Sequence, residues 1–104
     1  KEQITVDFRT LLSKYFAEHK NVSFYAKRLN ITSKYLSEVL LQEAGKTAKT
    51  LLEEHIFMEA KSMLRQTNMS VQEICHFLGY ADTSYFTKAF KKQEGMTPIA
   101  YRRL

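Results

Sequence analysis

The sequence contains a duplicated pair of short helices, and this duplication constrains the fold more than any other feature. Each copy has a residue that can cap a helix, about two helical turns, a tight turn and a second capped helix. The second copy lies 49 to 50 positions after the first, with one extra residue in its turn. Such a pair is typical of the helix-turn-helix, whose second helix enters the major groove of DNA. The matching residues are Asn21 and Ser70, Ala26 and Cys75, Leu29 and Leu78, Thr32 and Asp82, Leu40 and Phe90, Gly45 and Gly95, and Thr47 and Thr97.

The spacing of apolar residues predicts an all-α fold of about seven helices. Only 3 Gly and 1 Pro are present, too few for the many turns of an all-β protein. One helix is expected over about residues 4–19, and a longer one over about 48–66 has no internal Gly or Pro. At about 1.5 Å per residue the longer helix would extend roughly 28 Å. The expected organisation is a first helix-turn-helix subdomain at 1–46, a connecting helix at 47–67 and a second subdomain at 68–104.

Single residues indicate where the helices begin and end. Ser70 and Glu73 have the spacing of a capping box, in which each side chain accepts a hydrogen bond from a free backbone N–H group. Pro98 fits the first position of a last short helix, where its missing N–H costs nothing. The other expected N-caps are Asn21, Thr32 or Ser33, Thr47, Asp82 and Thr97, and the expected helix ends are Asn30, Gly45, Gly79 and Gly95.

The aromatic residues are assigned mainly to the core. Six Tyr and seven Phe suggest a base-stacking surface of the kind that single-strand binders use. Most of them, however, fall on the inward stripes of the expected helices, so core packing accounts for them better. The inward stripes of the second helices are expected to hold Tyr35, Leu36, Val39 and Leu40 in the first copy, and Tyr85, Phe86, Ala89 and Phe90 in the second.

The charge distribution favours an anionic partner. The formal net charge is +5 and the pI is near 9.4, which suits nucleic acid. Residues 1–50 hold nine basic and five acidic groups, and residues 83–104 hold five and one. Residues 51–82 hold two basic and five acidic groups. Positive charge therefore accompanies the two helix pairs, as binding to phosphate at two places would require.

No enzyme, cofactor or metal is expected from the sequence, because paired carboxylates, a nucleophile–base set and a phosphate loop are all missing. His55 and Glu59 have metal-ligand spacing, but no third ligand lies nearby, which favours a solvated surface. Cys75 beside His76 suggests a reactive pair, yet Cys75 matches Ala26, which favours a buried inert thiol. One cysteine, no signal peptide and no long apolar run indicate a cytoplasmic protein.

The stretch Gly79-Tyr80-Ala81-Asp82-Thr83-Ser84-Tyr85-Phe86-Thr87-Lys88-Ala89-Phe90-Lys91-Lys92 closely resembles the C-terminal signature of AraC/XylS-type transcriptional regulators. The resemblance continues through Gly95-Met96-Thr97-Pro98 to Tyr101-Arg102 and covers about residues 5–104 in all. Two departures stand out: Ile56 replaces a common Arg of the connecting helix, and Ser37-Glu38 replaces an often Arg-rich first reading helix. The first affects nothing functional, and the second leaves the base preference of the first unit open.

By position, the resemblance implies a base-facing set of DNA-binding residues, and the inward stripes leave the same positions outside. Short hydroxyl side chains let a helix approach base edges, Lys can reach guanine or phosphate, and Glu38 can accept from a cytosine amino group. Helix starts can place backbone N–H groups against phosphate. The base-facing set is Ser33, Lys34, Ser37, Glu38, Thr83, Ser84, Thr87 and Lys88, and the phosphate set is Asn21, Thr47, Ser70, Lys91, Lys92, Thr97 and Arg102.

The resemblance implies that double-stranded DNA is the partner and that a bacterial activator works through RNA polymerase. The sequence starts at Lys1 and enters a helical pattern within a few residues, so we expect a piece of a longer protein with a missing N-terminal sensor or dimerisation domain. The alternative is a basic helical module that binds protein or RNA without sequence preference. The duplication favours the first hypothesis, because a generic module needs no second copy at fixed spacing.

Overall fold

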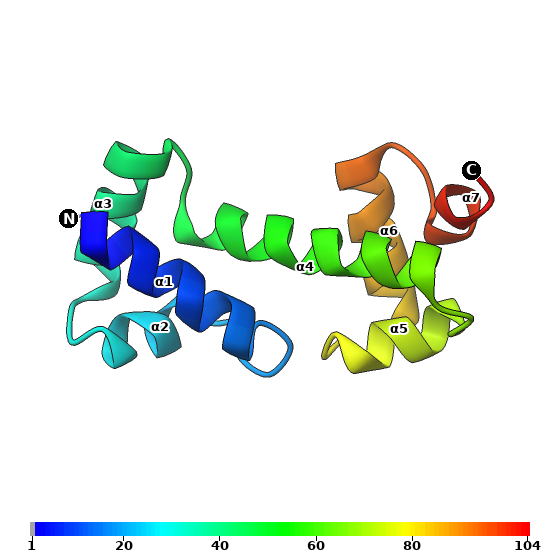
Figure 1. Cartoon of the computed structure of the whole chain (residues 1–104), viewed down its shortest axis with the longest axis horizontal. Coiled ribbons are helices and arrows are strands. Elements are labelled where there is room, and N and C mark those ends of the chain that lie inside the picture. Colours follow the sequence, from blue (N-terminus) through cyan, green and yellow to red (C-terminus); the bar gives the residue numbers. More distant parts are fainter. Residues whose placement is uncertain (1) are drawn as a thin grey trace. The chain divides into compact units, whose positions relative to one another are not determined.

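The computed structural model describes residues 2–104, with side chains from Gln3 onward, and this part of the chain is entirely helical apart from its connections. The fold class predicted from the sequence is therefore confirmed. None of these helices has the length and hydrophobicity that crossing a membrane requires. The helices are α1 (Glu2–Tyr15), α2 (Val22–Arg28), α3 (Ser33–Ala44), α4 (Ala48–Gln66), α5 (Val71–Phe77), α6 (Thr83–Glu94) and α7 (Pro98–Arg102), labelled in Figure 1.

The chain divides into two compact units, and the boundary between them falls between His55 and Ile56, inside α4. In the first unit α1 packs against both α2 and α3, and these two helices pack against each other. Phe8 and Tyr25 form an edge-to-face pair in its core, with ring centroids 5.5 Å apart. The first half of α4 belongs to this unit: Leu51 and Leu52 are buried, and the His55 ring lies 4.8 Å from that of Phe16.

In the second unit α6 packs against α5 and α7. Phe57, from the second half of α4, lies with its ring 5.9 Å from the rings of both Phe86 and Phe90 on α6. All three are buried, as are Ile74 and Leu78. An ion pair between Lys61 and Glu94, with a 3.1 Å separation, lies at the edge of this core. Each unit thus holds its second helix by a buried stripe and leaves the opposite face outside.

The predicted N-caps are confirmed wherever the structure describes them. Thr32, rather than Ser33, caps α3, and its hydroxyl accepts a hydrogen bond from the N–H of Tyr35 at 3.0 Å. The Ser70 capping box is complete: Glu73 accepts from the Ser70 N–H at 2.8 Å, and Ser70 accepts from the Glu73 N–H at 3.0 Å. Asn21, Thr47, Asp82 and Thr97 also accept hydrogen bonds from backbone N–H groups of the helices that follow them.

The two tight turns share one hydrogen-bond pattern, which locates the extra residue of the second copy. After α2 the N–H of Ile31 donates to the carbonyl of Ala26 at 3.0 Å, and after α5 the N–H of Tyr80 donates to that of Cys75 at 3.0 Å. These are the long hydrogen bonds of a Schellman motif, which needs a left-handed residue. Asn30 and Gly79 supply it, with φ of 59° and 88°. Because the turns match up to this point, the insertion is Ala81.

The predicted end of the first helix was wrong by about four residues. The α1 helix ends at Tyr15, after which the N–H groups of Glu18 and His19 both donate to the Tyr15 carbonyl, at 3.1 and 2.9 Å. Contacts with α2 redirect the chain here: the His19 ring stacks on that of Phe24 at 3.7 Å, and the Tyr25 hydroxyl donates to the His19 carbonyl at 2.6 Å. Burial raises the pKa of Tyr25 from 10.0 to about 12.

The inward assignment of two tyrosines was also wrong. Tyr35 is 40% exposed and Tyr85 is 61% exposed, whereas the residues directly after them, Leu36 and Phe86, are fully buried. Neighbouring residues of an α-helix differ by about 100° in direction, since a turn takes about 3.6 residues. The buried stripe of each helix is narrower than predicted, and each tyrosine lies at its outer edge.

Candidate nucleic-acid interface

The outward faces of α3 and α6 form the candidate interface. The buried side chains Leu36, Val39 and Leu40 fix the direction of α3, and Phe86 and Phe90 fix that of α6. The four predicted base-facing positions of each helix are spaced i, i+1, i+4 and i+5, so they share one face. Ser33, Lys34, Glu38, Ser84 and Lys88 are exposed, and Ser37, Thr83 and Thr87 are half-buried. Each unit therefore brings its four predicted residues together on one surface of its second helix.

The two faces differ in charge. On α6, the side chains of Lys88, Lys91 and Lys92 are all exposed, and no acidic residue lies between Thr83 and Lys92. On α3, Lys34 is opposed by Glu38 one turn away. The position of Lys91 is taken in α3 by Leu41, which is 50% exposed. The face of α6 therefore offers the stronger attraction to phosphate.

The predicted phosphate contacts at helix starts have side chains that are already in use. The Thr47 hydroxyl oxygen accepts from the Thr50 N–H at 3.1 Å, and the Asn21 Oδ1 accepts from the Ser23 N–H at 3.0 Å. Ser70 and Thr97 are occupied in the same way. A phosphate at any of these four places would therefore meet remaining backbone N–H groups rather than the capping oxygen, so these contacts stay predictions.

Arg102 has a structural role that the sequence did not reveal. Its Nε donates to the carbonyl of Leu64 at 2.9 Å, and its Nη2 donates to that of Thr67 at 3.2 Å. Leu64 lies in the last turn of α4, where helix carbonyls lack intrahelical partners, and Thr67 directly follows the helix. Arg65 adds to this corner by placing its guanidinium 5.2 Å from the centroid of the Tyr101 ring. Contact of Arg102 with phosphate stays a prediction, with two of its nitrogens already committed to the protein.

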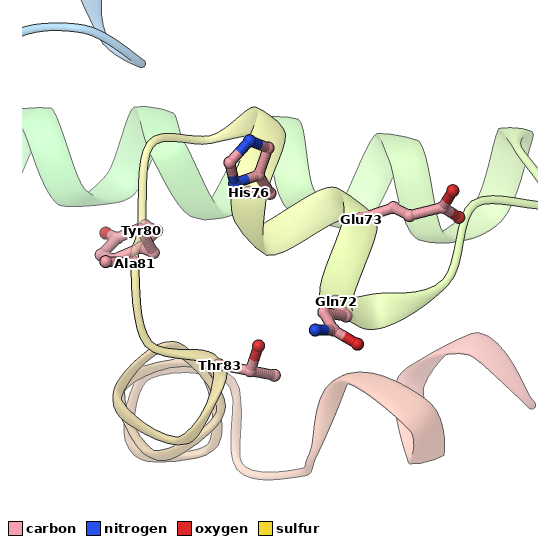
Figure 2. A pocket seen from close by; sticks show the side chains of 6 residues that line it. All are labelled: Gln72, Glu73, His76, Tyr80, Ala81 and Thr83. Atoms are coloured by element: carbon pink, nitrogen blue, oxygen red, sulfur yellow. The ribbon is translucent and has the colours of Figure 1, made fainter.

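A hollow of about 440 Å³ lies between α5 and the start of α6. Figure 2 shows Gln72 and Thr83 facing the same open space, while the carboxylate of Glu73 points away from His76. That carboxylate is the one bonded to the Ser70 N–H. Gln72, His76 and Thr83 can all donate hydrogen bonds, and of these three only Thr83 belongs to the predicted DNA-binding residues. The hollow is lined by Gln72, Glu73, His76, Tyr80, Ala81 and Thr83.

The remaining reactive residues have packing roles. Cys75 is buried, as predicted, with its Sγ 3.6 Å from the carbonyl oxygen of Tyr80. Ile56, which replaces the common Arg of the connecting helix, is buried too. Among the residues that the structure describes, no three His, Cys, Asp or Glu side chains are grouped to hold a metal ion.

Sequence comparison relates the chain to transcriptional regulators. The family model described as "helix-turn-helix domain" matches residues 25–104. The chain is 29% identical over 104 residues to the HTH-type transcriptional regulator YisR of Bacillus subtilis, covering all of this chain and 36% of that protein. It is 36% identical over 75 residues to the raffinose operon regulatory protein RafR of Pediococcus pentosaceus, covering 72% of this chain and 27% of that one. The chain thus spans about a third of these relatives or less.

Structural comparison gives the same family. The C-terminal domain of AraT, a response regulator from Geobacillus stearothermophilus, superposes with a TM-score of 0.89 at 32% identity, covering 96% of this chain and 84% of that one. An AraC-type regulator from Chromobacterium violaceum superposes with a TM-score of 0.90 over 98% of this chain and 91% of that one, and at 18% identity it shows the shared fold. The chain belongs to the AraC-type helix-turn-helix family and is a DNA-binding domain of a transcriptional regulator.

Proposed function

We propose that the chain binds double-stranded DNA in a sequence-specific manner, with α3 and α6 each reading one box in a major groove. The observation that carries this proposal is the repeated geometry: two helix-turn-helix units place the same four positions on the outward side of their second helices. Family membership supports the same function. A structurally similar DNA-binding domain, that of AdpA, was solved in complex with a target DNA.

The base-reading residues differ between the two units. In the first unit Ser33, Lys34, Ser37 and Glu38 face the bases. In the second unit Thr83, Ser84, Thr87 and Lys88 do so. Lysine at the groove floor favours guanine acceptors, and a carboxylate favours the cytosine amino group. The two boxes are therefore expected to differ in sequence, because Glu38 needs a hydrogen-bond donor on the base and Lys88 needs an acceptor.

Phosphate contacts position each unit on the duplex without reading sequence. Lys91 and Lys92 supply charge on α6, and the starts of the helices at Asn21, Thr47, Ser70 and Thr97 supply backbone N–H groups. Because α6 presents the larger positive charge, we expect the second unit to contribute more of the salt-dependent affinity.

The whole protein is proposed to be a bacterial, cytoplasmic transcription activator that works with RNA polymerase. Support comes from the relatives, which are transcriptional regulators much longer than this chain. The additional length of such relatives is consistent with an N-terminal sensor or dimerisation domain joined to a DNA-binding domain of this type.

Selection of bound sequences from random duplexes tests the proposal directly. We expect two enriched boxes, and binding to the selected duplex should weaken steeply between 50 and 200 mM salt because condensed counterions are released. Lys88→Ala should weaken binding, whereas Lys14→Ala, an exposed change on α1, serves as the matched control for loss of one positive charge. Equal affinity for random DNA and for RNA would overturn the proposal in favour of a non-specific basic module.

A further inference from the structure

Each second helix exposes a tyrosine at the same place in its first turn. Tyr35 is the third residue of α3 and Tyr85 the third residue of α6, and the two align when the sequence is shifted by 50. The core of each unit does not need these rings, because Leu36 and Phe86 fill it from the next position. Because packing of the core does not account for a large exposed ring in both copies, a binding role is the better explanation.

The tyrosines lie directly beside the proposed reading residues. Tyr85 precedes Lys88 by three positions and Tyr35 precedes Glu38 by three, a spacing that makes side chains neighbours on a helix surface. In helix-turn-helix proteins the N-terminal residues of the second helix contact base edges. Both rings therefore lie within the part of the helix that would reach the groove.

The ring of Tyr85 packs against a second aromatic ring, that of Tyr80. Its centroid lies 6.0 Å from that of Tyr80, and the Tyr80 ring lies 5.3 Å from the buried ring of Phe86. This row of three rings limits the directions in which Tyr85 can point, so less conformational entropy is lost when the ring meets a partner. In the first unit Ile31 takes the place of Tyr80, and Tyr35 is 40% exposed.

We propose that Tyr35 and Tyr85 are specificity-determining residues that pack their rings on the 5-methyl group of a thymine, one in each box. This inference rests on the proposed DNA-binding function and extends it. The methyl group of thymine is the apolar feature that base pairs present in the major groove, and apolar side chains contact it there. On α3 the other reading positions hold serine, lysine and glutamate, which offer no large apolar surface. On α6 Thr83 and Thr87 carry methyl groups that can also contact thymine, but both residues are half-buried, whereas the Tyr85 ring is 61% exposed. The two boxes then share a thymine at equivalent positions although their other bases differ.

Replacing thymine by uracil tests this contact, because it removes the methyl group and leaves the hydrogen-bonding edge intact. In the selected duplex, one uracil replacement in the α6 box should reduce affinity of the parent protein about fourfold, the equivalent of one buried methyl group. Tyr85→Ala should bind the thymine duplex more weakly and lose the difference between thymine and uracil at that position. Tyr85→Phe, which keeps the ring, should retain the difference. Tyr35→Ala and Tyr35→Phe should behave in the same way at one position of the other box.

Phe77→Ala is the matched control, because Phe77 is an aromatic side chain on α5 with 57% exposure. It should leave both affinity and thymine discrimination unchanged. Thermal melts of all variants check that the fold is retained. The methyl contact is wrong if the parent binds every uracil-substituted duplex as tightly as thymine, if Tyr85→Ala still discriminates, or if Tyr85→Phe loses discrimination as fully as Tyr85→Ala. Those outcomes leave DNA binding itself intact, whereas failure of the parent to select any duplex overturns the proposed function.

Discussion

The guanidinium of Arg102 is hydrogen-bonded to the carbonyl of Leu64, 38 residues earlier in the chain, with a 2.9 Å separation from its Nε. This bond and the one to Thr67 tie α7 to the end of α4 within the second unit. Removing the charged donor breaks the part-buried bond to Leu64 and the exposed bond to Thr67, which costs roughly 1.5–3 kcal/mol. We expect Arg102→Met to lower the free energy of unfolding by that amount in urea titrations.

A matched pair separates this structural role from phosphate binding. Arg103 is exposed and adjacent, so Arg103→Met removes the same charge without removing the two hydrogen bonds. If Arg102 acts only as a clamp, its replacement changes stability and leaves the salt dependence of DNA binding like that of Arg103→Met. An unchanged melting temperature together with a salt slope reduced by about 1 would instead identify Arg102 as a phosphate contact.

The buried hydroxyl of Tyr25 makes stability depend on pH in the alkaline range. Burial raises the pKa of Tyr25 from 10.0 to about 12 in the folded protein, so the folded state holds this proton more tightly than the unfolded state. The stabilisation is fully present below pH 10 and is lost as the pH rises toward 12, by about 2–3 kcal/mol. The variant Tyr25→Phe has no ionisable hydroxyl, so it lacks this pH-dependent stabilisation. It also lacks the hydrogen bond to the His19 carbonyl. The difference between parent and variant in unfolding free energy should therefore shrink from pH 9 to pH 12; a constant difference would contradict the assignment.

Local features of this fold were predictable from sequence because their causes are local. Ser70 and Glu73 satisfy N–H groups within three residues, and Gly45 and Gly95 end their helices with φ of 72° and 81°. The role of Arg102 was not predictable, since its partners are more than 30 residues away. The periodicity of apolar residues predicts which side of a helix is buried, but it does not predict how wide the buried stripe is. That width decides whether Tyr35 and Tyr85 face the core or the solvent. The exposed positions of Ser84 and Lys88 follow from the centre of the stripe, whereas the hollow beside His76 depends on how α5 and α6 pack.

Gly45 and Gly95 offer a test of backbone conformation alone. Both adopt left-handed φ, and a Cβ built on either meets no atom within 4 Å. Alanine at these positions therefore costs only the left-handed conformation, about 1–2 kcal/mol each, with no steric clash. Asparagine, which tolerates this conformation better, should cost less. Urea titration of Gly95→Ala and Gly95→Asn checks the order; equal losses would point to a cause other than φ.

Substitutions at two residues of α6 should distinguish effects on DNA binding from effects on folding. Lys88 is exposed on the reading face and Phe90 is fully buried against Phe57. Lys88→Ala should keep the melting temperature and weaken DNA binding, and it should relax preference at one base position by roughly 1–3 kcal/mol if Lys88 reads a base. Thr87→Ala should also keep the fold. Phe90→Ala should destabilise the second unit by roughly 3–5 kcal/mol. A parent-like melt of Phe90→Ala would contradict the position of the buried stripe.

The last prediction concerns joint reading of DNA by the two units. The α4 helix runs without interruption from Ala48 to Gln66, and 19 residues at about 1.5 Å each make it roughly 28 Å long. A connecting element of this length predicts two boxes about one turn of B-DNA apart, which is about 10–11 base pairs from centre to centre. Inserting five base pairs between the boxes moves one of them to the opposite side of the duplex. Affinity should then fall to that of a duplex carrying a single box, and an insertion of ten base pairs, which restores the face but doubles the distance, should not recover it. Indifference of the affinity to the five-base-pair insertion would mean that the two units do not read one site together.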